Sequence, residues 1–572
     1  MTVVATAGHV DHGKSSLVLA LTGTDPDRFE EEKRRGLTID LGFAHTVLPS
    51  GLQLSFIDVP GHVKFLRNML AGVGGVNACV FVVAATEGWK PQSEEHLRIL
   101  ELLGVRFGLV ALTKVDLVDD DLLELAKMDI ADHVAGTFLD GAPVVPVAAT
   151  LGVGIEEMRR EIDALIERSD GAADRARPRL WIDRVFAAKG SGTVVTGTLV
   201  GGVLSADDNV HVAPSGRAAR IRSIQTAGIG VERIGPGNRV ALNLGGVDHH
   251  ELLRGDAVIE PERWYLTDRI DASLDVLASL DHEVSRRGAY VAYVGAGEHS
   301  VKMRVLGTEA LAPGTTGAIR LFLPVALPLL PGDRFILRES GREETVGGGE
   351  VLDIAPVLRA SQAAPDRSLD RVVRERGWVR VDDLERLTGE VVPATLGDWV
   401  TTPEALAATV EAVVLRVAAA GVVGVDLAVF DERERAAIES SDDVVVETGL
   451  VLPADAVDPY VDHPFLDELL AGGFAPSAPD GVDRNDIREL ARRGHIVQRD
   501  GVVFHAATID AAARIAADLL ALTPEGFTVA GFRDATGASR KFVLPLVSEL
   551  DSRGVTRRRN DVRIAGPRLP VD

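Results

Sequence analysis

The sequence predicts a multidomain protein: an α/β domain, two antiparallel β-barrels, and then an α+β array of winged-helix domains. Three observations predict this order. Strand and helix patterns alternate over residues 1–168, short β-rich runs separated by glycine fill Leu180 to about Leu352, and helical periodicity returns beyond Pro365. We expect the domains to be residues 1–168, 178–262, 266–356, 366–440, 441–508 and 509–572.

Composition limits the possible classes of protein. The chain has 572 residues, enough for several domains, and its net charge of −24 argues against nucleic-acid binding by the whole surface. Cys79 is the single cysteine, which excludes an internal disulfide, and it lies in a buried-strand pattern. The sequence shows no secretory signal pattern and no uninterrupted apolar run of membrane-spanning length, so we expect a cytoplasmic protein.

The first chemical motif is Gly8-His9-Val10-Asp11-His12-Gly13-Lys14-Ser15, which matches the phosphate-loop pattern G-x-x-x-x-G-K-[ST]. A predicted strand, Thr2–Thr6, precedes it and a predicted helix, Ser16–Leu21, follows it. This order places backbone N–H groups and a helix N-terminus around a polyphosphate. The expected phosphate-binding residues are Gly8, Val10, Asp11, His12, Gly13, Lys14, Ser15, Ser16 and Gly61.

Two further segments complete a magnesium and phosphate site. Asp58-Val59-Pro60-Gly61-His62 follows the predicted strand Leu52–Ile57, and the charged segment Glu30–Asp40 contains Gly36-Leu37-Thr38. A loop of this kind orders when its threonine reaches Mg²⁺ and the γ-phosphate. The expected Mg²⁺ ligands are Ser15, Thr38 and Asp58.

The base is expected to bind Thr113-Lys114-Val115-Asp116, which follows the predicted strand Phe107–Leu112. Asp116 can accept hydrogen bonds from N1–H and the exocyclic amine of guanine, and Lys114 can lie along the ring. Thr113 stands where Asn is usual, so it offers a hydroxyl in place of an amide. The stretch Ala148-Ala149-Thr150, with Ala148 as the named candidate, can supply a backbone N–H to the guanine carbonyl.

The order of these motifs resembles the translational GTPases of the elongation factor Tu class. The resemblance implies an α/β P-loop GTPase domain that binds GTP or GDP with Mg²⁺ and hydrolyses GTP when the ribosome stimulates it. It also implies that His62 is catalytic and positions the attacking water, with Val10 and Leu37 as an apolar gate.

Other stretches resemble the selenocysteine-specific elongation factors, from Met1 to about Ala355. They are Asp40–Phe43, Leu70–Gly75, Asp183–Phe186, Lys189–Thr198, Pro331–Arg338 and Thr345–Gly349. The resemblance implies that the first barrel binds aminoacyl-tRNA, that the second barrel also binds tRNA, and that Asp183, Arg184 and Arg239 form the aminoacyl pocket.

Fixed positive charge suits such a pocket. A selenol is more acidic than a thiol, so a selenocysteyl group is an anion at neutral pH, whereas cysteine, with a pKa of about 8.5, is mostly neutral. Ordinary surface ion pairs are the alternative explanation for the same three residues.

The C-terminal part contains a repeat. Leu490–Asp500 is echoed by Leu550–Asn560, with Leu, Arg, Gly and a later Arg aligned, and a fainter echo links Gly377–Gly389 with Gly526–Gly537. Each copy predicts two helices and a two-stranded wing, and we expect three or four such units.

The last unit is strongly basic. Its candidate RNA-binding residues are Arg533, Arg540, Lys541, Arg557, Arg558 and Arg559. They suit one localised contact with the phosphate backbone of a folded RNA, and a solvated basic helix face is the alternative. In the bacterial selenocysteine factors that the chain resembles, such a tail holds an mRNA hairpin beside a recoded UGA codon.

Together these features predict a monomer without a membrane segment that delivers selenocysteyl-tRNA to ribosomes at a structured mRNA. Two alternatives remain: a carrier of ordinary or initiator aminoacyl-tRNA, and a GTP-gated nucleic-acid-binding regulator without a tRNA role. The tail and the Asp183, Arg184 and Arg239 set count against the first, and the two barrels count against the second. Asp248-His249-His250-Glu251 brings no further ligand set, so Mg²⁺ is the only metal expected.

Overall fold

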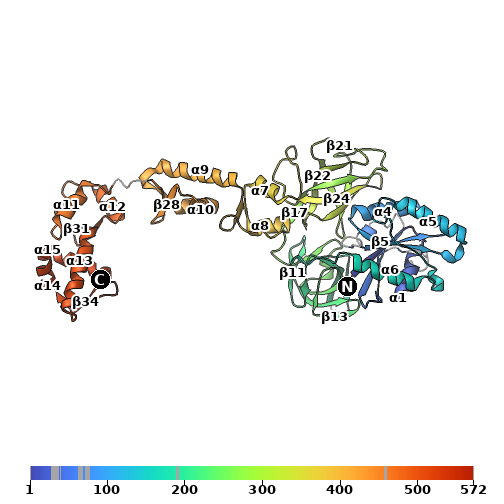
Figure 1. Cartoon of the computed structure of the whole chain (residues 1–572), viewed down its shortest axis with the longest axis horizontal. Helices are drawn as coiled ribbons and strands as arrows, with labels where there is room; N and C mark the ends of the chain where they lie inside the picture. Colours follow the sequence, from blue (N-terminus) through green and yellow to red (C-terminus); the bar gives the residue numbers. More distant parts are fainter. Residues whose placement is uncertain are drawn as a thin grey trace. The chain divides into compact units, whose positions relative to one another are not determined.

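The computed structural model of the chain describes residues 2–26, 38, 40–61, 68–70, 76, 78–188, 192–455 and 460–570. His62 and Leu37, which the sequence assigned to catalysis and to the gate, lie outside these residues. The chain forms two compact units, Met1–Ala405 and Leu406–Asp572 (Figure 1).

An α/β sheet opens the first unit. Within the described residues its six strands run in the order β2 (Gly42–Val47), β3 (Gln53–Asp58), β1 (Thr2–Ala7), β4 (Ala78–Ala84), β5 (Phe107–Thr113) and β6 (Val144–Pro146). Only the β2–β3 pair among them is antiparallel. Every residue of β4 is buried, as its unbroken apolar run predicts. Cys79 is part of this core, and burial raises the pKa of its thiol.

Helices cover both faces of this sheet. They are α1 (Lys14–Thr22), α4 (Pro91–Leu102), α5 (Asp120–Val134) and α6 (Ile155–Arg168), with the short turns η2 (Val115–Leu117) and η3 (Ala149–Leu151). Apolar residues of α1 and α6 share one core, and those of α4 and α5 share the other. The carboxyl ends of β1, β3 and β5 therefore meet at one edge, where such sheets bind ligands.

Six strands of the described chain close the first barrel. In ring order they are β11 (Asn209–Ala213), β16 (Ala257–Ile259), β7 (Arg179–Trp181), β9 (Gly192–Val200), β15 (Asn238–Gly245) and β12 (Arg217–Thr226). The strand β8 (Arg184–Ala188) also pairs with β9, and β13 (Ile229–Val231) pairs with β12. A small pair, β10 (Leu204–Ser205) and β14 (Arg233–Ile234), and the turn η4 (His249–Glu251) complete this part.

The second barrel also closes with six described strands. They are β17 (Leu266–Val276), β22 (Thr316–Pro328), β20 (Gly297–Val305), β19 (Tyr290–Val294), β23 (Arg334–Glu339) and β24 (Glu344–Asp353), beside the pair β18 (Val284–Ser285) and β21 (Ala310–Leu311). The glycine run in β24 has a steric cause, because a Cβ on Gly349 would lie 1.9 Å from the Ser273 carbonyl oxygen. The two predicted barrels are thus confirmed.

Ion pairs join the parts of the first unit. Arg179 of the first barrel contacts both carboxylate oxygens of Asp333 beside the second barrel, each at 2.6 Å. Arg338 of β23 lies 3.5 Å from Glu95 of α4, and Ile336 is buried in the core shared with α4. The α/β domain and the barrels therefore pack as one body.

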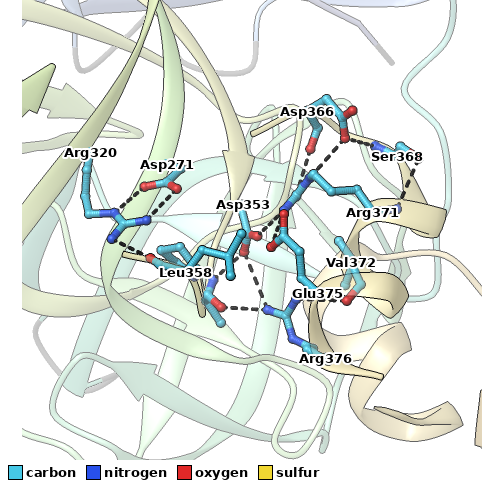
Figure 2. A network of polar contacts seen from close by, with 12 residues as sticks. Asp271, Arg320, Asp353, Leu358, Asp366, Ser368, Arg371, Val372, Glu375 and Arg376 are labelled. Atoms are coloured by element: carbon cyan, nitrogen blue, oxygen red, sulfur yellow. Dashed lines mark hydrogen bonds and ion pairs between the residues drawn. The ribbon is translucent and has the colours of Figure 1, made fainter. Parts of the chain in front are cut away.

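A small winged-helix motif ends the first unit. Its elements are α7 (Leu369–Arg376), β25 (Trp378–Arg380), α8 (Val381–Thr388) and β26 (Trp399–Thr401). Figure 2 shows how α7 is attached: Arg371 bonds Asp353 at 3.0 Å, Glu375 at 2.9 Å and Asp366 at 3.0 Å. A neighbouring pair, Arg320 and Asp271, links β22 to β17.

The second compact unit contains three helix–sheet groups within its described residues. The first has α9 (Pro403–Ala420) from Leu406 onward, η5 (Gly421–Val423), β27 (Val425–Asp426), η6 (Leu427–Val429), α10 (Glu432–Glu439), β28 (Val444–Glu447) and β29 (Leu450–Pro453). The second has α11 (Pro464–Gly472), α12 (Arg484–Arg492), β30 (Ile496–Arg499) and β31 (Val502–His505). The third has α13 (Ala506–Leu522), β32 (Phe527–Thr528), α14 (Val529–Thr536), α15 (Arg540–Ser552), β33 (Thr556–Arg559) and β34 (Val562–Ala565).

One expected division falls inside a core. Ile438 of α10 and Val444 of β28 belong to the same buried cluster, which also holds Phe430 and Val451. A boundary between residues 440 and 441 would separate this helix from the sheet that covers it. We propose instead that the division follows β29.

The sequence repeat has a structural counterpart. Leu490 and Leu550 are both fully buried near the ends of α12 and α15. After each helix a glycine, Gly494 or Gly554, has a positive φ of 82° or 72° and leads into an antiparallel hairpin. The aligned residues thus encode the same helix end and wing.

The stretch Pro403–Val423 is long and apolar enough to cross a membrane by length and composition, with a mean hydropathy of 1.9 over its best window and 11% of that window buried. A single helix of this kind is weak evidence for a membrane segment, since helices of soluble proteins meet the same criteria.

The Arg371 network gives a stability prediction. Replacing Arg371 with Ala leaves the buried Asp353 carboxylate without its closest cation, so we expect a loss of about 3 kcal/mol. The matched control is Arg367→Ala, which breaks a more exposed pair with Glu350 and should cost about 0–1 kcal/mol. Urea unfolding followed by circular dichroism compares the two midpoints, and equal midpoints would contradict the network's role.

Candidate functional site

The three expected magnesium ligands lie together. Ser15 Oγ is 2.8 Å from Thr38 Oγ1 and 2.7 Å from Asp58 Oδ2. The other Asp58 oxygen accepts a hydrogen bond of 2.7 Å from Thr6. Hydroxyl and carboxylate oxygens are the ligands that Mg²⁺ prefers, so this set fits the ion.

Lys14 and Gly61 meet across the phosphate loop. The Lys14 ammonium donates to the carbonyls of Gly8 at 3.0 Å and His9 at 2.7 Å. A Cβ on Gly61 would lie 2.5 Å from that ammonium and 2.6 Å from the Val10 nitrogen. Only glycine therefore lets the segment after β3 approach the loop this closely.

The loop backbone has positive φ values at three positions. Asp11 and Gly13 have positive φ values of 62° and 86°, and Gly8 has 124° with its missing Cβ placed 2.2 Å from the Val82 carbonyl oxygen. The Gly8 N–H donates to His96 Nδ1 at 3.1 Å. Gly8 is thus engaged in shaping the loop, whereas Gly13 caps α1, whose first residues include Lys14, Ser15 and the exposed Ser16.

Two histidines of this region stay neutral. Burial lowers the pKa of His12 to about 4 and that of His96 to about 3. Neutral imidazoles can accept hydrogen bonds, which is how His96 holds the Gly8 N–H. The pKa of His9 is lowered too, mainly by burial.

The predicted base-binding residues occupy different environments. Asp116 is exposed in η2, and Lys114, with a φ of 58°, has its ammonium 3.4 Å from Glu87. Thr113 is buried and donates its hydroxyl to the His12 carbonyl at 2.6 Å. Its side chain therefore holds the phosphate loop through this bond.

Ala148 was expected to donate its backbone N–H to the guanine carbonyl. In the structure this N–H donates to the Val153 carbonyl at 3.0 Å, so the donor is already used. The turn η3 begins at Ala149, and the first N–H groups of a helical turn have no partner within the turn. We therefore propose Ala149 in its place as the donor for a base carbonyl.

The three predicted pocket residues of the first barrel also come together. Arg239 makes a two-point contact with Asp183, with one bond of 2.9 Å, and Thr196 donates to Asp183 at 2.7 Å. Arg184 of β8 lies opposite Thr196 of β9, and Arg239 of β15 lies opposite Thr198 of β9. Because side chains alternate along a strand, both arginines lie on the same face of the sheet.

An aromatic ring from the α/β domain, that of Phe43, lies close to both arginines. The guanidinium carbons of Arg184 and Arg239 are 4.4 Å and 3.6 Å from the centre of the Phe43 ring. Arg184 also bonds the Leu41 carbonyl and lies 3.6 Å from Asp40. Sequence reasoning missed Phe43 as a pocket residue, although it belongs to the quoted stretch Asp40–Phe43.

The predicted RNA-binding residues are exposed in the last helix–sheet group. Arg533 lies in α14 and pairs with its neighbour Asp534, and Arg540 and Lys541 open α15. Arg557, Arg558 and Arg559 follow Thr556 in β33. In contrast, Arg563 is buried against Asp551, so it supports the wing from inside.

The Thr113 contact gives a testable expectation. Thr113→Val removes the donor to the His12 carbonyl, and we expect the domain to lose about 1–3 kcal/mol of stability. Thr113→Ser keeps the hydroxyl and is the matched control. Thermal unfolding distinguishes them, and a valine variant as stable as the serine variant would show that the bond contributes nothing.

Two family models match the chain. The elongation factor Tu GTP-binding domain matches residues 1–168, and the winged helix of elongation factor SelB matches residues 519–565.

Curated relatives match over part of their length. The selenocysteine-specific elongation factor of Desulfomicrobium baculatum is 42% identical over 353 residues, which cover 61% of this chain and 55% of the relative. That of Escherichia coli (strain K12) is 34% identical over 405 residues, 68% of this chain and 64% of the relative. The matches thus span between about half and two thirds of these relatives.

Solved structures extend the likeness. The crystal structure of bacterial selenocysteine-specific elongation factor EF-Sec matches with a TM-score of 0.74 and 25% identity, covering 99% of both chains. Translation elongation factor SelB from Methanococcus maripaludis, in complex with the GTP analogue GPPNHP, has the same fold over 62% of this chain, with a TM-score of 0.53. Residues 1–168 match the elongation factor Tu GTP-binding domain, and the chain resembles selenocysteine-specific elongation factors in sequence over 61–68% of its length and in fold over 99%.

Proposed function

We propose that this protein is a GTPase that carries selenocysteyl-tRNA to the ribosome at a recoded UGA codon, held through its C-terminal winged helices to an mRNA hairpin. The observation that carries this proposal is that one chain joins an elongation factor Tu GTP-binding domain to a SelB winged helix. The fold of the EF-Sec relative over the whole chain supports it. We expect the protein to act as a cytoplasmic monomer.

In the nucleotide site, Ser15, Thr38 and Asp58 would hold Mg²⁺. Lys14 would exchange its loop carbonyls for the β- and γ-phosphates, and Gly61 lies next to it. Mg²⁺ would neutralise charge on the phosphate oxygens, and His62 would position the attacking water behind the gate of Val10 and Leu37. Asp116 and Lys114 would bind guanine, with Ala149 as the backbone donor.

In the aminoacyl pocket, the guanidinium groups of Arg184 and Arg239 both lie over the Phe43 ring. Asp183 orients Arg239 through a two-point bond, and guanidinium groups carry the fixed positive charge that such a pocket needs. A selenolate would be stabilised by this charge, whereas a neutral serine hydroxyl or cysteine thiol would gain much less.

Phe43 also connects the two sites. It lies in β2, directly after the segment that contains Thr38 and Asp40, and Asp40 lies near Arg184 and Arg254. A change in this segment when GTP replaces GDP would therefore alter the arginine positions. We infer that tRNA binding depends on the nucleotide through this contact.

The selectivity is tested by competition on the GTP-loaded protein between selenocysteyl-, cysteinyl- and seryl-forms of the same tRNA. We expect the selenocysteyl form to bind best, and Arg239→Ala to reduce this preference at least tenfold. Arg217→Ala, which removes an exposed arginine of the same barrel paired with Glu251, is the matched control. Equal binding of all three forms by the unchanged protein would favour the general aminoacyl-tRNA carrier.

The RNA interaction is tested by salt dependence with a hairpin from the mRNA of a selenoprotein of the same organism. Changing Arg557, Arg558 and Arg559 to Gln should weaken binding and reduce the slope of log K against log salt by about 0.7–0.9 for each phosphate that the protein no longer neutralises. The control changes Arg416, Arg433 and Arg435 to Gln. These arginines lie in α9 and α10, in the first helix–sheet group of the second unit. Equal effects of both triple variants would indicate diffuse binding and contradict the wing's role.

A further inference from the structure

The phosphate loop brings two imidazoles and a carboxylate together, and the proposed GTP chemistry assigns no role to their side chains. His9 and His12 belong to the loop, and Glu87 follows β4. One ligand atom from each of the three lies within 4.8 Å of the others. The two rings have centroids 4.9 Å apart and an interplanar angle of 65°, so they do not stack face to face.

One nitrogen atom of each ring is buried without a hydrogen-bond partner within the described part of the chain. The His12 side chain is fully buried, its Nδ1 lies 3.4 Å from the Val82 carbonyl oxygen, and its Nε2 has no hydrogen-bond partner. His9 Nδ1 is also buried without a partner. A buried polar nitrogen with no partner costs free energy, which a ligand would recover.

The orientation of His12 is the one that metal-binding histidines adopt. Such a histidine donates one ring N–H to a carbonyl or carboxylate and turns the other nitrogen, with its lone pair, toward the metal. The Val82 carbonyl accepts from Nδ1, which leaves the lone pair on Nε2. Both histidines are neutral near pH 7, so no proton has to leave before they coordinate.

We propose that His9, His12 and Glu87 form a binding site for a divalent transition metal of the zinc type. Two imidazoles and one carboxylate, with water in the remaining position, are an established ligand set for Zn²⁺. This site is separate from the oxygen cluster of Ser15, Thr38 and Asp58, which suits Mg²⁺.

The required adjustment is small. A tetrahedral ion with bonds of about 2.0–2.2 Å holds its ligand atoms about 3.4 Å apart, so the present cluster has to contract by at most about 1.5 Å. His9 is partly exposed and Glu87 is exposed, so their side chains can rotate while His12 stays in place.

Neighbouring lysines compete with the metal for Glu87. The Lys114 ammonium is 3.4 Å from one Glu87 oxygen, and Lys90 is 4.0 Å from the other. A bound metal would replace one of these contacts, and the released Lys114 belongs to the predicted guanine motif. Metal and nucleotide would then be thermodynamically coupled through Glu87.

The experiment uses the untagged full chain with Co²⁺ as the probe and Mg²⁺ in excess to fill the oxygen site. Tetrahedral Co²⁺ with nitrogen ligands absorbs visible light, and equilibrium dialysis gives its affinity and stoichiometry. We expect a single ion to bind and Zn²⁺ to displace it. His9→Gln and Glu87→Gln should each weaken Co²⁺ binding about tenfold or more.

The matched control is the double change His249→Gln and His250→Gln, which removes the exposed histidine pair beside Asp248 and should leave Co²⁺ binding unchanged. Circular dichroism verifies that each variant is folded. The proposal is overturned if the unchanged chain binds no Co²⁺. It is also overturned if either single variant binds Co²⁺ as the unchanged chain does, or if the control loses binding.

Discussion

The carboxylate of Asp58 is the centre on which the nucleotide site depends. It is fully buried at the carboxyl end of β3, and hydroxyl groups from two other segments, Thr6 and Ser15, bond its two oxygens. Thr6 also accepts the N–H of Val59, so one small network fixes β1, the phosphate loop and the segment after β3. Carboxylate and hydroxyl oxygens are the ligands that Mg²⁺ prefers, so this arrangement suits a bound metal ion.

Close steric contacts at two glycines also position the phosphate loop. Gly8 and Gly61 lie where a Cβ would collide with backbone atoms of Val82 and Val10. The loop therefore packs closely against β4 at Gly8 and against the segment after β3 at Gly61. Thr113 adds a hydrogen bond to the carbonyl of His12. A hydroxyl is enough for this anchor, because it can donate to one carbonyl.

Ion pairs of low exposure connect the folded parts of the first unit. Arg179 with Asp333 connects the barrels, and Arg371 with Asp353 connects the second barrel to α7. Such pairs are sensitive to geometry, because a buried charge without its partner is strongly destabilising.

Local chemistry determined much of this protein. Three motifs could be recognised because each occupies only a few consecutive residues: the phosphate loop, the Asp-Val-Pro-Gly segment and the base motif that ends in Asp116. Glycine spacing and strand periodicity predicted the barrels. The repeat that ends at Leu490 and Leu550 predicted matching helices and wings, because the same turn residues terminate both helices.

Only the tertiary structure brought Phe43 into contact with both Arg184 and Arg239, since the three residues are far apart in the sequence. It also decided that the N–H groups of Gly8 and Ala148 are already bonded, and that α10 packs on β28 across the expected boundary. A residue type states which bonds a group can make. Which partner it finds depends on segments that the fold brings together, and no local pattern contains that information.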